Sequence, residues 1–131
     1  MQRKYKRKYF RIKPENELYS EITIVRLNSR KITAGSAYVR VINISPGGLK
    51  FMSGLDFPAG TDMVLKFKLE LSGYSVSPEG YIVHKSKVND NNFEYGVCFI
   101  NVDNSMRHLL VKLFNMVMSQ VKNYIIVQRH H

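Results

Sequence analysis

The sequence contains one cysteine, Cys98, among its 131 residues, and it contains no tryptophan. A single cysteine excludes an internal disulfide and a zinc site built on paired cysteines. No uninterrupted apolar run is long enough to span a membrane, and no apolar segment follows the basic N-terminus as it would in a signal peptide. These absences predict a cytoplasmic protein without a membrane span.

The common catalytic motifs are also missing. The chain has no GxGxxG, no GxxxxGK[ST] and no G-x-S-x-G, and its four histidines show no metal-ligand spacing. Cys98 lies between two apolar residues, which predicts an inert, buried thiol. The terminal pair His130-His131 is read as the remnant of an expression tag and set aside. We therefore expect a binding module that is not an enzyme and holds no metal.

Positive charge is abundant and unevenly distributed. The formal net charge is +10, and residues 1–13 carry seven cations and no acid, whereas the rest of the chain carries thirteen cations and ten acids. A flexible basic arm over 1–13 predicts an anionic partner such as phosphate, nucleic acid or acidic lipid. From charge alone, a solvated tail explains the arm equally well.

The body of the chain, residues 14–102, has the pattern of short antiparallel strands. Apolar and polar residues alternate as they do in half-buried strands, with turn signals at Pro46-Gly47-Gly48 and at 89–92. The strand-like segments are 19–27, 31–45, 49–52, 63–71, 81–83 and 95–100. No helical segments separate them, which favours a mainly β barrel or sandwich over a parallel doubly wound sheet.

The C-terminal segment, 103–129, changes to a helical period. Polar residues such as His108, Lys112 and Asn115 recur at steps of three and four, and apolar residues do the same on another face. The pattern predicts an amphipathic helix over about 105–127. Packing on the β body is the favoured arrangement, with self-association and membrane-surface binding as the other options.

Two short motifs carry functional information. The first is the RxxxR spacing of Arg7 and Arg11, whose Cα atoms lie ~13 Å apart in an extended chain, with Tyr9 between them on the same side. The planar guanidinium fork binds a phosphate or the O6/N7 edge of guanine with two hydrogen bonds. Arg3 and Arg7 repeat the spacing, so the register of this motif is open from spacing alone.

The second motif is the NxSxxG segment from Asn43 to Gly48. Asn43 and Ser45 share one face of a strand, and Ile44 points to the other. An amide offers donors and an acceptor to a base edge, and a hydroxyl can bond a phosphate. Gly47 and Gly48 allow the chain to turn or a ligand to approach closely. A simple hairpin turn with a polar rim has the same pattern.

Together, the two motifs resemble the PilZ domain family. The NxSxxG segment begins 32 positions after Arg11, in a small β body with a C-terminal helix. The run from Glu94 to Phe99 is similar to a later strand of that family that carries a G-V-x-F pattern. The resemblance implies a six-stranded antiparallel β-barrel with a C-terminal amphipathic helix. It also implies a receptor for cyclic di-GMP.

The resemblance assigns roles to five residues. It implies that Arg7 and Arg11 grip the phosphates and guanine edges of the ligand. It implies that Asn43 contacts a guanine and that Ser45 contacts a phosphate or a guanine. Gly48 would allow close approach of the ligand. No cofactor is implied besides the nucleotide ligand.

Three further residues are candidates for the same site: Lys6, Tyr9 and Gly47. A cation at Lys6 is compatible with a stacked ligand dimer. Asn43 stands where aspartate is commoner in the family, and a neutral amide cannot accept charge-assisted bonds from guanine, so we expect a lower affinity.

The expected mechanism is a switch in which cyclic di-GMP draws the basic arm onto the barrel and the changed surface signals to a downstream protein. The expected state is a monomer or a weak homodimer. Two alternatives stay open. One is a PilZ-like interaction module that binds no ligand, and the other is a single-stranded nucleic-acid binder that uses the basic, aromatic arm.

Overall fold

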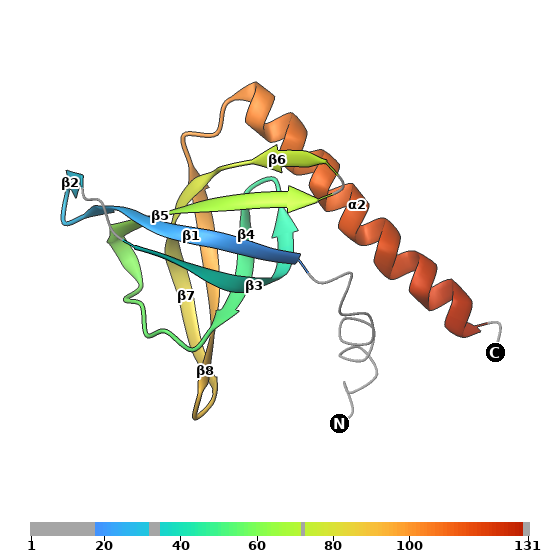
Figure 1. The fold of residues 1–131 in the computed structure, drawn as a ribbon, viewed down its shortest axis with the longest axis horizontal. Helices are drawn as coiled ribbons and strands as arrows, with labels where there is room; N and C mark the ends of the chain where they lie inside the picture. Colours follow the sequence, from blue (N-terminus) through green and yellow to red (C-terminus); the bar gives the residue numbers. More distant parts are fainter. Residues whose placement is uncertain (1–17, 32–34, 72, 130–131) are drawn as a thin grey trace.

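A computed structural model describes residues 18–31, 35–71 and 73–129, with side chains as far as residue 119. The expected basic arm, the first residues of the expected body and the terminal histidine pair lie outside these ranges. The described chain forms eight strands and one helix (Figure 1). They are β1 (Leu18–Leu27), β2 (Arg30–Lys31), β3 (Ser36–Ser45), β4 (Gly48–Ser53), β5 (Gly60–Leu71), β6 (Tyr74–Val76), β7 (Glu79–Asn89), β8 (Asn92–Ile100) and α2 (Asn104–Arg129).

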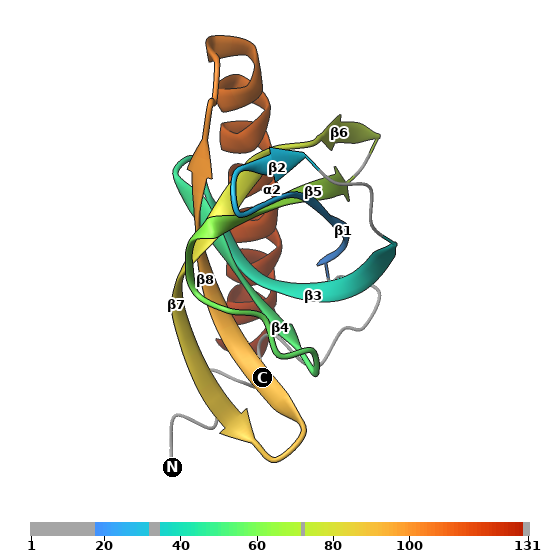
Figure 2. The same ribbon diagram turned by 90° about the vertical axis from the view of Figure 1, so that its left-hand side faces the viewer.

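Six of the strands close into a barrel in the order β1-β3-β4-β8-β7-β5, and a pairing between β5 and β1 completes the ring. Every pairing is antiparallel, and the short strands β2 and β6 extend the sheet beside β1 and β5. Figure 2 shows the curved sheet and the long β7–β8 hairpin that extends from it. The predicted six-stranded antiparallel barrel with a C-terminal helix is therefore confirmed.

Alternation along the strands decides which side chains fill the barrel. From Leu65 onward β5 alternates strictly: Leu65, Phe67 and Leu69 are buried, and Lys66, Lys68 and Glu70 are exposed, while Met63 and Val64 before them are both buried. Side chains from the same inward positions of the other strands complete one continuous core. Because successive side chains on a strand point to opposite faces, each strand also presents an outer row to its surroundings.

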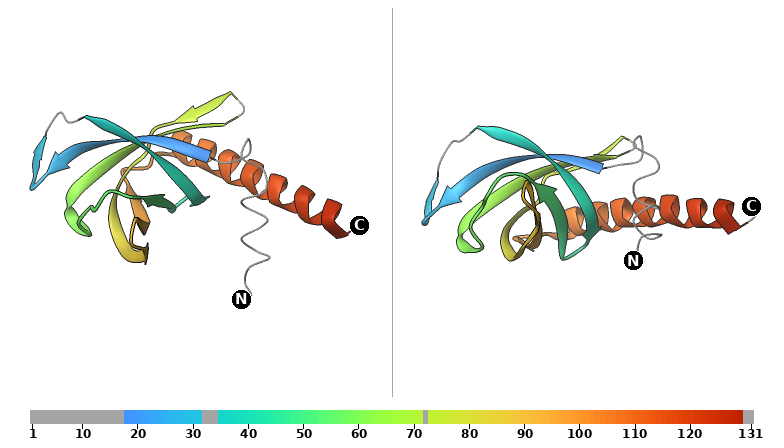
Figure 3. Two further views of the ribbon diagram at one scale, coloured as in Figure 1. Left: turned by 60° about the horizontal axis from the view of Figure 1, so that its bottom comes forward. Right: turned by 90° about the horizontal axis from the view of Figure 1, so that it is seen from below.

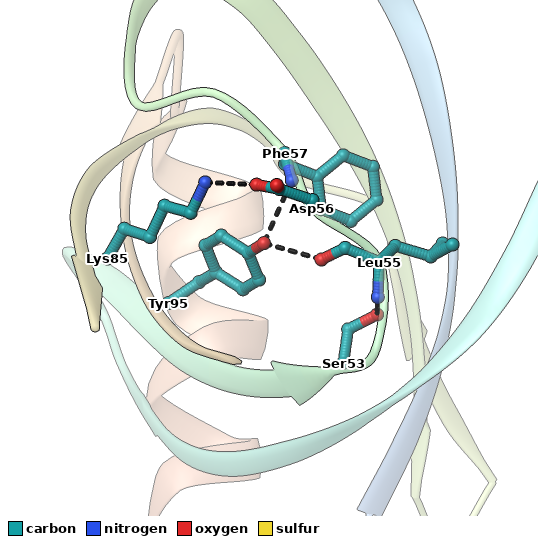
Figure 4. A network of polar contacts seen from close by, with 6 residues as sticks. All are labelled: Ser53, Leu55, Asp56, Phe57, Lys85 and Tyr95. Carbon is teal, nitrogen blue, oxygen red and sulfur yellow. Dashed lines mark hydrogen bonds and ion pairs between the residues drawn. The ribbon is translucent and has the colours of Figure 1, made fainter. Parts of the chain in front are cut away.

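An aromatic cluster fills the barrel interior near the β4–β5 loop. Phe51 stacks on Tyr95 with ring centroids 4.8 Å apart, and both side chains are fully buried. The Tyr95 hydroxyl donates to the Leu55 carbonyl at 2.5 Å and accepts from the Phe57 N–H at 2.8 Å (Figure 4). The buried Tyr95 hydroxyl therefore has both a donor and an acceptor partner, and it ties the loop to β8.

The C-terminal helix begins at an aspartate cap. The Asp103 carboxylate accepts a hydrogen bond from the Met106 N–H at 2.8 Å, which satisfies one of the free donors of the first turn. Leu110 and Leu113 are fully buried in the barrel core, and α2 contacts β3 and β6. The predicted packing on the β body is confirmed for this first half. Figures 1 and 3 show that the helix then continues past the barrel.

Within the described part of the chain, no helix is both long enough and apolar enough to cross a bilayer.

Candidate functional site

The NxSxxG segment forms the end of β3, a tight turn and the start of β4. Ser45 pairs with Gly48 across the hairpin, and the Ser45 hydroxyl donates to the Gly48 carbonyl at 3.3 Å. Asn43 and Ser45 are exposed on the outer face, whereas Ile44 is 1% exposed and lies in the core. The prediction that the two polar residues share a face is confirmed.

Asn43 lies on the turn side of a bulge in β3. It pairs with Lys50 on the outer face, in unbroken register with the turn, and the register with β4 shifts only beyond it, between Asn43 and Val41. The Asn43 side-chain oxygen accepts a hydrogen bond from the Ile44 N–H at 2.8 Å. This bond engages the amide oxygen, so the donors that Asn43 can offer to a ligand are those of its NH₂ group.

The outer groove is an open hollow of about 560 Å³ over the outside of β3, β4, β8 and β7. It brings together all four described residues of the predicted site, which are Asn43, Ser45, Gly47 and Gly48. Eight other residues line it: Ile44, Leu49, Lys50, Val83, His84, Gly96, Val97 and Cys98.

Two cross-strand rows build the groove. One row runs through Asn43, Lys50, Gly96 and His84, each of which pairs with the next. The neighbouring row runs through Ser45, Gly48, Cys98 and Tyr81. The groove is open over Gly96, which contributes no side chain to the outer face. A flat group such as a base could therefore lie directly on the sheet there.

Gly48 is required by the fold itself. A Cβ at this position would lie 2.0 Å from the backbone carbonyl oxygen of Val97 on β8. No rotamer change relieves a contact with backbone, so only glycine allows β4 and β8 to approach this closely. Gly47 is different, since a Cβ there would meet nothing within 4 Å. Strand pairing thus explains the motif glycine Gly48 independently of any ligand.

A second bulge shapes the opposite wall of the groove. The register between β7 and β8 shifts between Ile82 and His84, so Val83 is the extra residue. As a result Val83 and His84 are both exposed, with Val83 at 59%. The sequence pattern gave no sign of this bulge, and neither residue was expected in the site.

Cys98 also lies in the groove, which corrects the expectation of a buried thiol. Val97 and Phe99 point inward and are buried, and alternation places Cys98 on the outer face, where it is partly exposed. Its Sγ–H makes a long contact, 3.7 Å, with the Phe99 carbonyl. Two inward-facing apolar neighbours indicate an outward-facing residue in a strand, so the alternation itself contained the correct signal.

The predicted arm residues Lys6, Arg7, Tyr9 and Arg11 lie outside the described residues. The start of β1 nevertheless shows where the arm joins the barrel. Leu18 pairs with Val41, which precedes Asn43 by two residues on β3. Arg11 precedes Leu18 by seven residues, a distance that a chain can span up to ~25 Å. The covalent connection therefore leaves the motif arginines within reach of the outer groove.

Lys50 was also not expected in the site, although the sequence held a signal for it. Once Pro46-Gly47 is taken as a two-residue hairpin turn, counting outward along both strands brings Lys50 beside Asn43.

Across residues 18–31, 35–71 and 73–129, no group of three histidine, cysteine or acidic residues could hold a metal ion. The donors in the groove are amide, hydroxyl, ammonium and imidazole groups, which suit an anionic or nucleotide ligand.

Comparison with protein families gives one match. A model of the PilZ domain family matches residues 2–115, which include both motifs and the whole barrel. No curated protein matches the chain. The PilZ domain is a receptor domain of the type that binds cyclic di-GMP, rather than an enzyme fold. With a match over most of its length and a closed barrel that carries the NxSxxG hairpin, this chain belongs to the PilZ domain family.

Proposed function

We propose that this protein is a cyclic di-GMP receptor that binds the nucleotide in the outer groove and closes its basic arm over it. The observation that carries the proposal is the juxtaposition of Asn43 and Ser45 in an open groove beside the point where the arm joins the barrel. The bound state would present a new surface to a downstream protein, because the groove contains no arrangement of catalytic groups.

The groove and the arm would have complementary tasks. The Asn43 NH₂ group can donate to the O6/N7 edge of a guanine, and the Ser45 hydroxyl can bond a phosphate or a base. Two phosphates need more positive charge than the groove wall supplies, and residues 1–13 carry seven cations. Arg7 and Arg11 would provide it through bidentate bonds and stacking on the bases.

Calorimetry with cyclic di-GMP tests the proposal. We expect binding by the wild-type chain, and at least about tenfold weaker binding by Arg7→Ala and by Arg11→Ala, because each loses charge-assisted bonds to the ligand. Cyclic di-AMP and GTP are the control ligands. Absence of both heat and chemical-shift changes at high ligand concentration would reject the receptor function.

The same variants separate the receptor from a nucleic-acid binder. A basic arm that binds single strands through many phosphates shows a steep salt dependence and tolerates the loss of any one cation. A receptor loses binding sharply at the motif arginines and at Asn43. Tight binding of single-stranded DNA that survives Arg7→Ala would favour the nucleic-acid function.

Cys98 provides a local test of where the ligand lies. It is the only thiol in the chain and it lines the outer groove. We expect saturating cyclic di-GMP to slow alkylation of Cys98 by iodoacetamide about fivefold or more, since a ligand in the groove covers the sulfur. Mass spectrometry of the intact chain measures the rate.

The double variant Arg7→Ala/Arg11→Ala is the matched control for this experiment. At the same nucleotide concentration its alkylation rate should be unchanged by the ligand. An unprotected Cys98 in wild-type protein that calorimetry shows to be saturated would place the ligand outside the groove.

A further inference from the structure

The outer groove is lined by two basic side chains that the PilZ motifs do not include. Lys50 and His84 are exposed and occupy the same cross-strand row as Asn43. Among the described residues, neither side chain has a hydrogen-bond or ion-pair partner. Both are therefore free to bind a ligand in the groove.

Gly96 separates these two side chains and leaves the space between them open. Lys50 and His84 each pair with Gly96, one from β4 and one from β7. With strands ~4.8 Å apart, the Cα atoms of Lys50 and His84 lie roughly 10 Å from each other. A Cβ on Gly96 would lie only 3.2 Å from the His84 Cβ, which shows that any side chain at position 96 would occupy this space.

We propose that Lys50 and His84 hold one phosphate of the nucleotide above Gly96, next to the guanine that Asn43 binds. This inference rests on the proposed receptor function and adds a phosphate seat formed by the barrel to the arginines of the arm. An ammonium and an imidazole that face each other across a bare glycine can both donate to phosphate oxygens. The bulge at Val83 is what brings His84 to the outer face at this point.

Calorimetry of cyclic di-GMP binding with surface variants of the full chain tests the phosphate seat. We expect Lys50→Gln to weaken binding about tenfold and His84→Ala about fourfold, because each removes one donor to the phosphate. Lys50→Arg keeps the charge and should bind within about threefold of wild type. Lys66→Gln is the matched control, since it removes a lysine of β5 that is also exposed but lies outside the groove.

The outcomes separate this inference from the receptor function. Equal binding by Lys50→Gln, Lys66→Gln and wild type would overturn the phosphate seat and leave the receptor function intact. A loss in Lys50→Arg as large as that in Lys50→Gln would also overturn it, because charge would then not be the cause. Absence of binding by wild type would overturn both proposals.

Discussion

Replacing Gly48 by alanine is expected to lower the free energy of unfolding by about 3 kcal/mol. The added Cβ would lie 2.0 Å from the Val97 carbonyl oxygen, and the β3–β4 hairpin would have to move away from β8 to make room. In the closed barrel β4 also pairs with β3 and β8 also pairs with β7, so the displacement spreads into the neighbouring pairs. Thermal unfolding should show a melting temperature roughly 10 °C lower.

Gly47→Ala is the matched control, since it adds the same methyl group one residue earlier. Nothing lies within 4 Å of that position, and its backbone does not adopt the left-handed conformation that favours glycine. Its stability should change by less than about 0.5 kcal/mol. Equal stability of the Gly48 and Gly47 variants would contradict the explanation by strand packing.

This expectation affects how binding data on the NxSxxG motif are interpreted. A Gly48 variant that fails to bind cyclic di-GMP does not show that Gly48 contacts the ligand, because the groove itself would be displaced. Asn43 and Ser45 are exposed, and their side chains can be shortened with little effect on the core. Variants at these two positions therefore report on ligand contacts more directly than variants at Gly48.

The second large effect is expected at Phe51. Replacing it by alanine should cost about 4 kcal/mol, because the ring is fully buried and its removal leaves a cavity in the barrel. The ring stacks on Tyr95 and meets Phe57 and Phe67 edge to face, so all three lose a packing partner. Urea denaturation monitored by circular dichroism measures the loss.

Tyr38→Ala is the control for this prediction. Tyr38 is also an aromatic residue in a strand, but it is 75% exposed on β3. Its loss should cost under about 1 kcal/mol, mainly through the lower strand preference of alanine. A similar cost at both positions would show that the aromatic cluster does not form the centre of the core.

Local pattern explains why part of this structure could be predicted from sequence. The alternation on β5, the turn at Pro46-Gly47 and the helical period after Asp103 are all short-range features, and each gives the observed element. The NxSxxG residues could be placed on one face for the same reason. Their function, however, came from resemblance to a family rather than from the pattern itself.

The remaining features depend on contacts between distant segments. The pairing of β1 with β5 closes the barrel across about forty residues of sequence, and nothing local in either strand specifies it. The bulge at Val83 shifts the outer face of β7 by one residue. Strict alternation from the buried Ile82 would place His84 on the inner face, whereas it lies on the outer face. The wall of the groove that β7 forms was missed for that reason.

The first half of α2 packs in the barrel core, and its second half extends away from the barrel (Figure 1). Leu110 and Leu113 share the core with Ile44, whose neighbours on β3 face the outer groove. From Leu113 to Arg129 the helix extends for about 24 Å, at 1.5 Å per residue. A tilt of about 10° at Leu113 would swing the far end by roughly 4 Å. A small displacement of β3 beside the groove would thus be magnified at the tip of the helix.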